Sequence, residues 1–215
     1  MEEVVINLFP NFTLWKLHSF KQYLFFFLVI AAGVVFFYSW TRRLKAKRTP
    51  EAALARTEKR LKSVSQGQAQ VFIPGKKTIL AGDLVAVLPK DIVLLQVIHW
   101  GYRIKGSSQS EHWSIADNSE TRTLPNPLPR LRKDKERVEK ALVQAGIPPV
   151  TVHYLVVFAD NYAEPDFKLD DASLPYVTSL KGLKDWIRKR ELKPVPKEKL
   201  EPVLKTVSQI SREKE

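Results

Sequence analysis

A run of 20 residues without a charged side chain lies between Lys21 and Arg42, and it constrains the architecture more than any other feature. A helix of this length rises about 1.5 Å per residue and spans the roughly 30 Å hydrocarbon layer of a membrane. Aromatic residues stand at both ends of the run, as they do at membrane interfaces. The pattern predicts a transmembrane helix over residues 22–41, and the alternative is a helix buried in a protein core. The acidic start of the chain is not typical of a cleaved signal peptide.

Five basic residues and no acidic ones follow in residues 42–48. Because basic residues gather on the cytoplasmic side of a membrane span, residues 1–21 are expected to form a short extracytoplasmic N-terminus. The rest of the chain is then expected in the cytoplasm. The same cluster accounts for part of the formal net charge of +12, so the charge is only a moderate indication of nucleic-acid binding. The absence of cysteine excludes disulfides, thiolate zinc sites and a cysteine nucleophile.

Helix-like and strand-like patterns alternate after a basic linker at 42–50. Thr49 and Pro50 predict the start of one helix, and Gly146 the end of a second helix over 128–145. Apolar runs predict strands at 70–73, 78–88, 92–100 and 150–158, with a short strand around Trp113 and Ile115 and a short helix in 179–190. This order predicts an α/β domain over 51–190, with a mixed sheet flanked by helices. The charged, proline-containing tail at 191–215 is typical of a linker with one marginal helix.

The second predicted helix has apolar residues at roughly helical spacing, which are Leu131, Val138, Leu142 and Val143. We expect the first three to be buried against the strand that contains Tyr154 to Phe158.

One polar residue, Gln96, interrupts the apolar strand 92–98. In a strand, Gln96 faces the same way as Leu94 and Ile98. Asp83 lies thirteen residues earlier, on the preceding strand of a predicted hairpin. Two carboxylates at such positions would bind a hard divalent cation such as magnesium, and a lysine two residues after the second would orient or activate the attacking water. There is no Gly-rich phosphate loop and no G-x-S-x-G nucleophile elbow.

These residues resemble the nuclease-related domain (NERD) family, a branch of the PD-(D/E)xK nuclease superfamily. The matching stretches are 82–106, His112-Trp113, 125–147 with its Asn126-Pro127-Leu128, and 154–158. The resemblance covers about residues 51–190 and implies a restriction-endonuclease-like fold with a mixed sheet flanked by helices.

The sequence departs from the family pattern where the chemistry lies. Asp83 matches the family's metal-binding aspartate, but Gln96 stands at the glutamate position and Ile98 at the lysine position. Glu58 on the first helix is the candidate for a helical acid of the family. We therefore expect a vestigial pocket of Glu58, Asp83, Gln96 and Ile98, with no catalytic residue and no bound metal. Only Asp83 would hold a metal if any residue did, and magnesium is a cofactor only if the domain is active.

Other interpretations of these residues stay open. Asp83 could simply accept hydrogen bonds from backbone amides. His99 and His112, each before a tryptophan, are more often structural than ligands. Arg103 and Lys105 are candidates for nucleic-acid contacts, or for a catalytic base that has moved along the chain. Arg130, Arg132 and Lys133 are further candidates for phosphate contacts, although the interleaved acids Asp134, Glu136 and Glu139 favour a solvated helix face.

Three functions are compatible with these sequence features. The first is a membrane-anchored, catalytically inactive nuclease-related protein that binds nucleic acid or a protein partner. The second is an active magnesium-dependent DNA nuclease with a relocated base. The third is a structural membrane protein whose domain serves assembly.

Overall fold

The computed structural model describes residues 20–46, 49–74, 79–88, 91–147, 150–160, 164–189 and 197–212. Residues 1–19, 47–48, 75–78, 89–90, 148–149, 161–163, 190–196 and 213–215 lie outside the described part, as do the predictions made for them. The chain divides into two compact units, Met1–Lys47 and Arg48–Glu215. They are described separately below.

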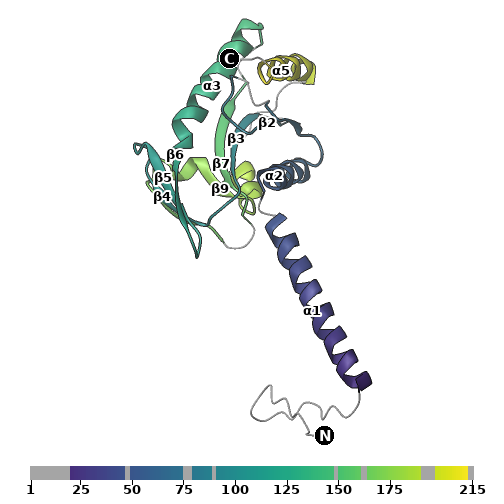
Figure 1. Cartoon of the computed structure of the whole chain (residues 1–215). Helices are drawn as coiled ribbons and strands as arrows, with labels where there is room; N and C mark the ends of the chain where they lie inside the picture. Colours follow the sequence, from purple (N-terminus) through teal and green to yellow (C-terminus); the bar gives the residue numbers. More distant parts are fainter. Residues whose placement is uncertain are drawn as a thin grey trace. The chain divides into compact units, whose positions relative to one another are not determined.

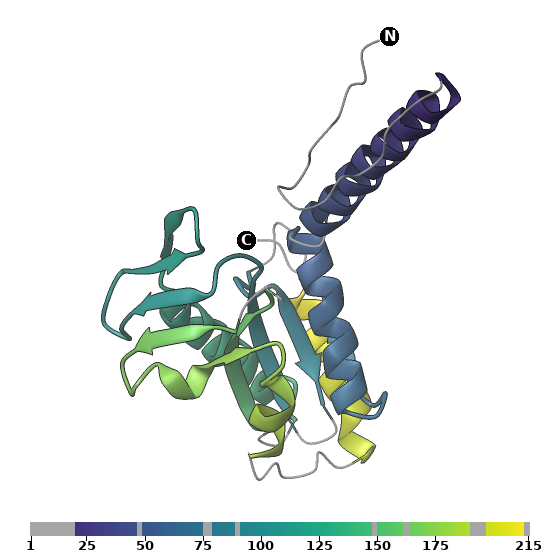
Figure 2. The same cartoon turned by 90° about the horizontal axis from the view of Figure 1, so that it is seen from below.

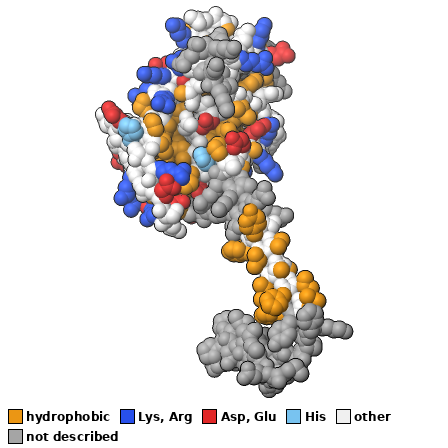
Figure 3. Space-filling model, viewed as in Figure 1, with side chains coloured by type: hydrophobic (Ala, Val, Ile, Leu, Met, Phe, Trp, Pro, Cys, Tyr) orange, Lys and Arg blue, Asp and Glu red, His pale blue; other side chains and the backbone are white. Residues whose placement is uncertain are grey.

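Helix α1 (Phe20–Ala46) is the described element of the first unit. Its large apolar side chains between Leu24 and Trp40 are mostly exposed, and they cover the helix surface in Figure 3. Among the described residues, however, no helix combines the length and the apolarity that crossing a membrane requires. The predicted span 22–41 is longer than the stretch 24–40 whose side chains are described. The prediction of a transmembrane helix is therefore not supported by the structure.

Helix α2 (Pro50–Val64) opens the second unit with the predicted cap. The Thr49 hydroxyl accepts a hydrogen bond from the Ala52 N–H at 3.2 Å, and proline occupies the first helical position. The buried side of this helix, which includes Ala53, Thr57 and Leu61, faces a five-stranded sheet, as Figure 2 shows.

The five-stranded sheet has the order β1-β2-β3-β7-β9. Its strands are β1 (Gln70–Phe72), β2 (Leu84–Val87), β3 (Ile92–Ile98), β7 (Val152–Phe158) and β9 (Val177–Ser179). The first three pair antiparallel, whereas β3, β7 and β9 run parallel. Strands buried on both faces read as continuous apolar runs, which is why β3 and β7 were recognisable in the sequence.

A second sheet of four strands, in the order β6-β5-β4-β8, was not predicted apart from the strand around Trp113. Its strands are β4 (Arg103–Gly106), β5 (His112–Ala116), β6 (Thr121–Pro125) and β8 (Asp166–Leu169). One face buries Ile104, Trp113 and Ile115 in the main core, and the other face carries polar or small residues. Gly106 is required beside Trp113, because a Cβ there would lie 2.3 Å from the indole ring.

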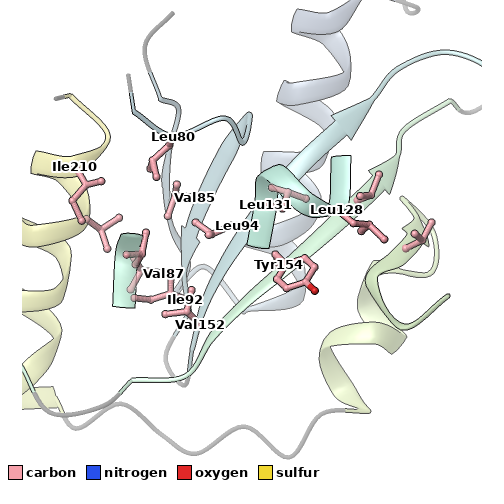
Figure 4. Packing of buried hydrophobic residues seen from close by; sticks show 14 of the residues in the cluster. Leu80, Val85, Val87, Ile92, Leu94, Leu128, Leu131, Val152, Tyr154 and Ile210 are labelled. Carbon is pink, nitrogen blue, oxygen red and sulfur yellow. The ribbon is translucent and has the colours of Figure 1, made fainter. Parts of the chain in front are cut away.

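Helix α3 (Pro127–Gln144) covers the opposite face of the five-stranded sheet from α2 (Figure 1). Leu131, Val138 and Leu142 are buried as predicted, but Val143 is 70% exposed. Figure 4 shows Leu131 and Leu128 of this helix near Leu94 and Tyr154 of the sheet. Gly146 follows the helix with a φ of 69°, in the left-handed conformation that glycine favours at this position.

The C-terminal region contains the 3-10 turn η1 (Leu174–Tyr176), helix α4 (Leu183–Arg188) and helix α5 (Lys197–Ile210). The one helix predicted in the tail is present as α5, but it packs against the core and is not a marginal helix in a linker. Val203, Val207 and Ile210 are buried, and all three belong to the same core cluster as the apolar side of α3. The prediction of an α/β domain with a mixed sheet flanked by helices is confirmed, with two mixed sheets in place of one.

Candidate functional site

Asp83 and Gln96 face each other across the pairing of β2 and β3. Leu84 is the register partner of Leu95 in this antiparallel pair. Asp83, just before Leu84, is therefore opposite Gln96, just after Leu95. Asp83 lies immediately before β2, and its backbone N–H donates to the Leu95 carbonyl at 2.8 Å. The hairpin predicted from sequence thus brings these two positions together near the start of β2 and the end of β3.

The Asp83 carboxylate is engaged by its own neighbours. Its Oδ2 accepts a hydrogen bond from the Gln96 side-chain amide at 2.7 Å and another from the Val97 backbone N–H at 2.7 Å. Burial raises the pKa of Asp83, while the Val97 hydrogen bond and nearby His99 lower it. The interpretation that Asp83 bonds to a backbone amide is confirmed, and Gln96 adds a second donor. An oxygen that would face a cation in an active site here accepts two N–H groups.

Ile98 lies on the same face of β3 as Gln96, half-buried against the core cluster of the α3 side. Its side chain can neither donate a proton nor orient water. The positions that carry a second carboxylate and a lysine in the family pattern are therefore filled by a donor amide and an aliphatic side chain, on the same strand.

Asp134 of α3 fixes the turn that leads into Asp83. This residue is buried, and its Oδ2 accepts hydrogen bonds from the Ala81 N–H at 2.7 Å and the Gly82 N–H at 2.9 Å. Burial raises the pKa of Asp134, and these hydrogen bonds and Arg137 oppose that shift. The expectation that Asp134 belongs to a solvated helix face was wrong. Glycine at position 82 lets this turn lie close to the backbone of β3, because a Cβ there would be 3.3 Å from the Leu95 carbonyl oxygen.

Glu58 does not join this group. Its carboxylate pairs with Lys62, one turn along α2, at 2.6 Å. The acid of α2 whose negative charge raises the pKa of His99 is Glu51, in the first turn of the helix. Asp160, which follows β7, acts on His99 as well.

His99 follows β3, and its surroundings shift its pKa in opposite directions. Burial and the positive charge of Arg122 lower its pKa, in that order. The carboxylates of Asp83, Glu51 and Asp160 oppose this shift. Sequence reasoning missed Glu51 and Asp160. The available signal was positional: residues after parallel strands meet at one edge of a sheet, and Asp160 comes two residues after β7.

The remaining candidates fall in three different places. Arg103 and Lys105 are exposed on the outer face of the four-stranded sheet, where Arg103 donates to the Asp117 carbonyl. Arg132 lines a cleft with Lys135 of the same helix. Arg130 and Lys133 are exposed elsewhere on α3, three residues apart and so on one side of the helix.

His112 is exposed on β5, thirteen residues after His99. Within the described ranges, no group of three or more histidine, cysteine, aspartate or glutamate side chains is arranged to hold a metal ion.

Comparison with known proteins gives one match. The sequence pattern of the family described as nuclease-related domain matches residues 51–159, which run from the first turn of α2 to the residue after β7. No curated protein and no solved structure matches the chain significantly. The match contains Asp83, Gln96 and Ile98, and it ends before β8, β9, α4 and α5.

Proposed function

Because this chain belongs to the nuclease-related domain family, we propose that it is a nuclease-like protein that binds nucleic acid without cutting it, anchored to a membrane through residues 22–41. The arrangement of two mixed sheets flanked by helices fits the PD-(D/E)xK type of fold. The observation that carries the proposal is the state of Asp83, whose carboxylate oxygen is already occupied by two hydrogen-bond donors.

The residues present do not fit a magnesium ion at this position. Magnesium is held by oxygen ligands in near-octahedral geometry, with carboxylates supplying the charge. The Gln96 amide turns its NH₂ group, not its oxygen, toward Asp83. A cation at Asp83 would have to break that hydrogen bond and would gain a neutral amide oxygen in return. We infer that neither a metal nor a catalytic base acts here.

The outer face of the four-stranded sheet is the surface that best suits a phosphate backbone. Arg103 and Lys105 of β4 lie beside Lys168 of β8, because Lys105 and Lys168 are register partners. Small residues from the neighbouring strands leave a shallow hollow of about 270 Å³ among them. Asp166 pairs with Lys168 at 3.6 Å and offsets one charge. The surface carries no aromatic side chain among the residues that line the hollow, so contacts to phosphates, and not base stacking, would dominate.

This proposal is tested by cleavage and binding assays on the compact unit that begins at Arg48. We expect no cleavage of single- or double-stranded DNA with magnesium or manganese, and salt-sensitive binding. Lys105→Ala and Lys168→Ala should each reduce the slope of log affinity against log salt by roughly 0.9. Lys59→Ala, an exposed lysine on α2, is the matched control and should leave the slope unchanged.

Two results would support the other functions. Metal-dependent cutting by the wild-type domain that is lost in Asp83→Ala would establish an active nuclease with a relocated base. The absence of any salt-sensitive binding to DNA or RNA would favour a protein partner or an assembly role. The double change Gln96→Glu with Ile98→Lys, if it folds, should gain magnesium binding measurable by calorimetry, since it restores the charged groups of the family pattern.

The membrane part of the proposal rests on the uncharged run and on the exposed apolar side chains of α1. Burying such side chains in hydrocarbon is favourable by about 0.8 kcal/mol per CH₂ group. The full chain should stay in the membrane fraction after an alkaline wash, and a chain without residues 1–47 should not. The basic cluster at 42–48 should keep the domain in the cytoplasm. Digestion of the domain by protease added to intact spheroplasts would overturn this orientation.

A further inference from the structure

A polar cleft of about 510 Å³ lies at the amino end of β7. Side chains of α3, the first residues of β7 and Tyr176 of η1 line it. Tyr154 is the register partner of Leu94, which lies two residues before Gln96 on β3. Neither Asp83 nor Gln96 is among the residues that line the cleft.

Two stacked tyrosines form one wall of this cleft. The rings of Tyr154 and Tyr176 lie parallel, with centroids 4.5 Å apart and an angle of 9° between their planes. Tyr154 is buried among aliphatic side chains, but its hydroxyl oxygen points away from them (Figure 4). Burial raises the pKa of Tyr154, whereas the Arg132 guanidinium lowers it and Tyr176 raises it again. Arg132, Tyr154 and Tyr176 all line the cleft.

Arg132 and the two tyrosine hydroxyls can together donate several hydrogen bonds to the two oxygens of one carboxylate. A guanidinium binds a carboxylate through two parallel N–H donors, and a phenolic hydroxyl can add a third. In the folded protein, Arg132 is itself exposed, and it forms no ion pair with the residues that the structure describes. A carboxylate that enters the cleft would give Arg132 the anionic partner that the described residues do not provide.

The part of α3 that lines the cleft carries two basic and two acidic side chains. Glu139 is offset by Lys135 at 3.6 Å, one turn away. Glu136 lines the cleft without an ion pair to any other described residue. Residues four apart on a helix have Cβ atoms about 5–6 Å from each other, so Arg132 and Glu136 are neighbours with opposite charge. A polyanion such as nucleic acid would be repelled by Glu136, whereas a small molecule with both charges would meet a partner for each.

We propose that this cleft binds a free amino acid, with its carboxylate on Arg132 and the two tyrosine hydroxyls and its ammonium group on Glu136. An α-amino acid has its carboxylate and its ammonium group attached to the same carbon. This matches the short distance between Arg132 and Glu136 on α3. The volume is within the range of about 300–1,000 Å³ that small-molecule sites occupy. The stacked tyrosine rings would lie beside the ligand's side chain and favour an aromatic one.

The test uses the full chain in mild detergent and isothermal titration calorimetry. The probes are glycine, L-lysine and L-phenylalanine, with N-acetyl-L-phenylalanine, which has no ammonium group, and L-phenylalaninamide, which has no carboxylate. We expect L-phenylalanine to bind, and each derivative to bind at least about tenfold more weakly, as the loss of one charged contact implies.

Variants separate the two halves of the head group. Arg132→Gln should abolish L-phenylalanine binding, and Glu136→Gln should weaken it and remove the preference over the N-acetyl derivative. Arg130→Gln, on the same helix but not among the residues that line the cleft, is the matched control and should bind as the wild type does. All three positions are exposed, so the variants should keep the wild-type circular dichroism. Binding by none of the three amino acids at millimolar concentration, or equal binding by Arg132→Gln, would overturn the proposal.

Discussion

Changing Gln96 to glutamate tests the geometry of the candidate site directly. In the wild type, the Gln96 amide donates to Asp83 Oδ2 at 2.7 Å. In Gln96→Glu, a second carboxylate takes the place of that donor, and two carboxylates at such a distance cannot both stay ionised. The variant should therefore bind one proton in the folded state that the unfolded chain releases at neutral pH.

The magnitude follows from comparing two costs. With an effective dielectric constant of about 20, two unit charges separated by 2.7 Å repel by roughly 6 kcal/mol. Leaving one carboxyl group protonated at neutral pH costs less, about 3.7 kcal/mol, from a reference pKa of about 4.3 and 1.36 kcal/mol per pH unit. Protonation is the cheaper route and sets the upper limit. We expect Gln96→Glu to reduce the free energy of unfolding by about 2–4 kcal/mol at neutral pH.

The pH dependence gives this prediction its sharpest form. A carboxyl group whose pKa is raised on folding destabilises the folded state above that pKa and not below the unfolded value. At about pH 5, the cost of protonation falls to about 1 kcal/mol by the same arithmetic. Urea unfolding at about pH 5 and about pH 7.5 should therefore show a penalty that shrinks by at least about 1 kcal/mol at the lower pH. Added magnesium should recover part of the loss at the higher pH.

A matched change separates this effect from a general cost of new charge. Gln70→Glu places the same substitution on β1, where the side chain is exposed, and should stay within about 0.5 kcal/mol of the wild type at both pH values. If Gln96→Glu costs the same at both pH values, or costs nothing, the two side chains are not adjacent and the interpretation of the site is wrong.

Other substitutions test the packing and the loops. Leu142→Ala should cost about 2–5 kcal/mol in chemical unfolding, whereas Val143→Ala, at an exposed position of the same helix, should stay within about 0.5 kcal/mol; equal effects would mean that the helix is rotated from its assigned orientation. Gly106→Ala should cost about 1–3 kcal/mol and shift tryptophan fluorescence, because its Cβ would collide with Trp113; an unchanged spectrum and stability would contradict that contact. Two serine hydroxyls lower the pKa of Asp170 from 3.8 to about 2. Its stabilisation should therefore be present above about pH 4 and lost toward about pH 2. Asp170→Asn should be less stable than the wild type at neutral pH, with a difference that disappears on acidification, and a constant difference would argue against a role for the charge.

The elements that could be predicted from sequence have signals contained within a single segment. The strand β3 is an unbroken apolar run apart from Gln96, and α2 carries its own cap in Thr49 and Pro50. The pairing of Asp83 with Gln96 was also foreseeable, because a short hairpin fixes which residues face each other. Each of these depends on residues close together in the chain.

The elements that escaped prediction depend on distant partners. Strands β4 and β8 have four residues each, with polar side chains on the outer face, so their alternation is too short to stand out. Asp134 looked solvated among charged neighbours, but its hydrogen-bond partners are the N–H groups of Ala81 and Gly82, more than 50 positions away. Helix α5 contains Pro202 and many charges, and only its packing shows that its apolar positions are buried.

Each of the two departures from the family pattern, Gln96 and Ile98, makes the other less costly for the stability of this fold. With Gln96 in place of glutamate, Asp83 keeps a hydrogen-bond donor and needs no cation to balance a second carboxylate. Without that cation and second carboxylate, a lysine at position 98 would be a half-buried charge with Asp83 as its nearby acid, and burying an incompletely paired charge is costly. Ile98 avoids this cost and packs against the core. Reversing either change alone should therefore be unfavourable, which would let the outline around Asp83 persist in a domain that, as proposed, does not cut nucleic acid.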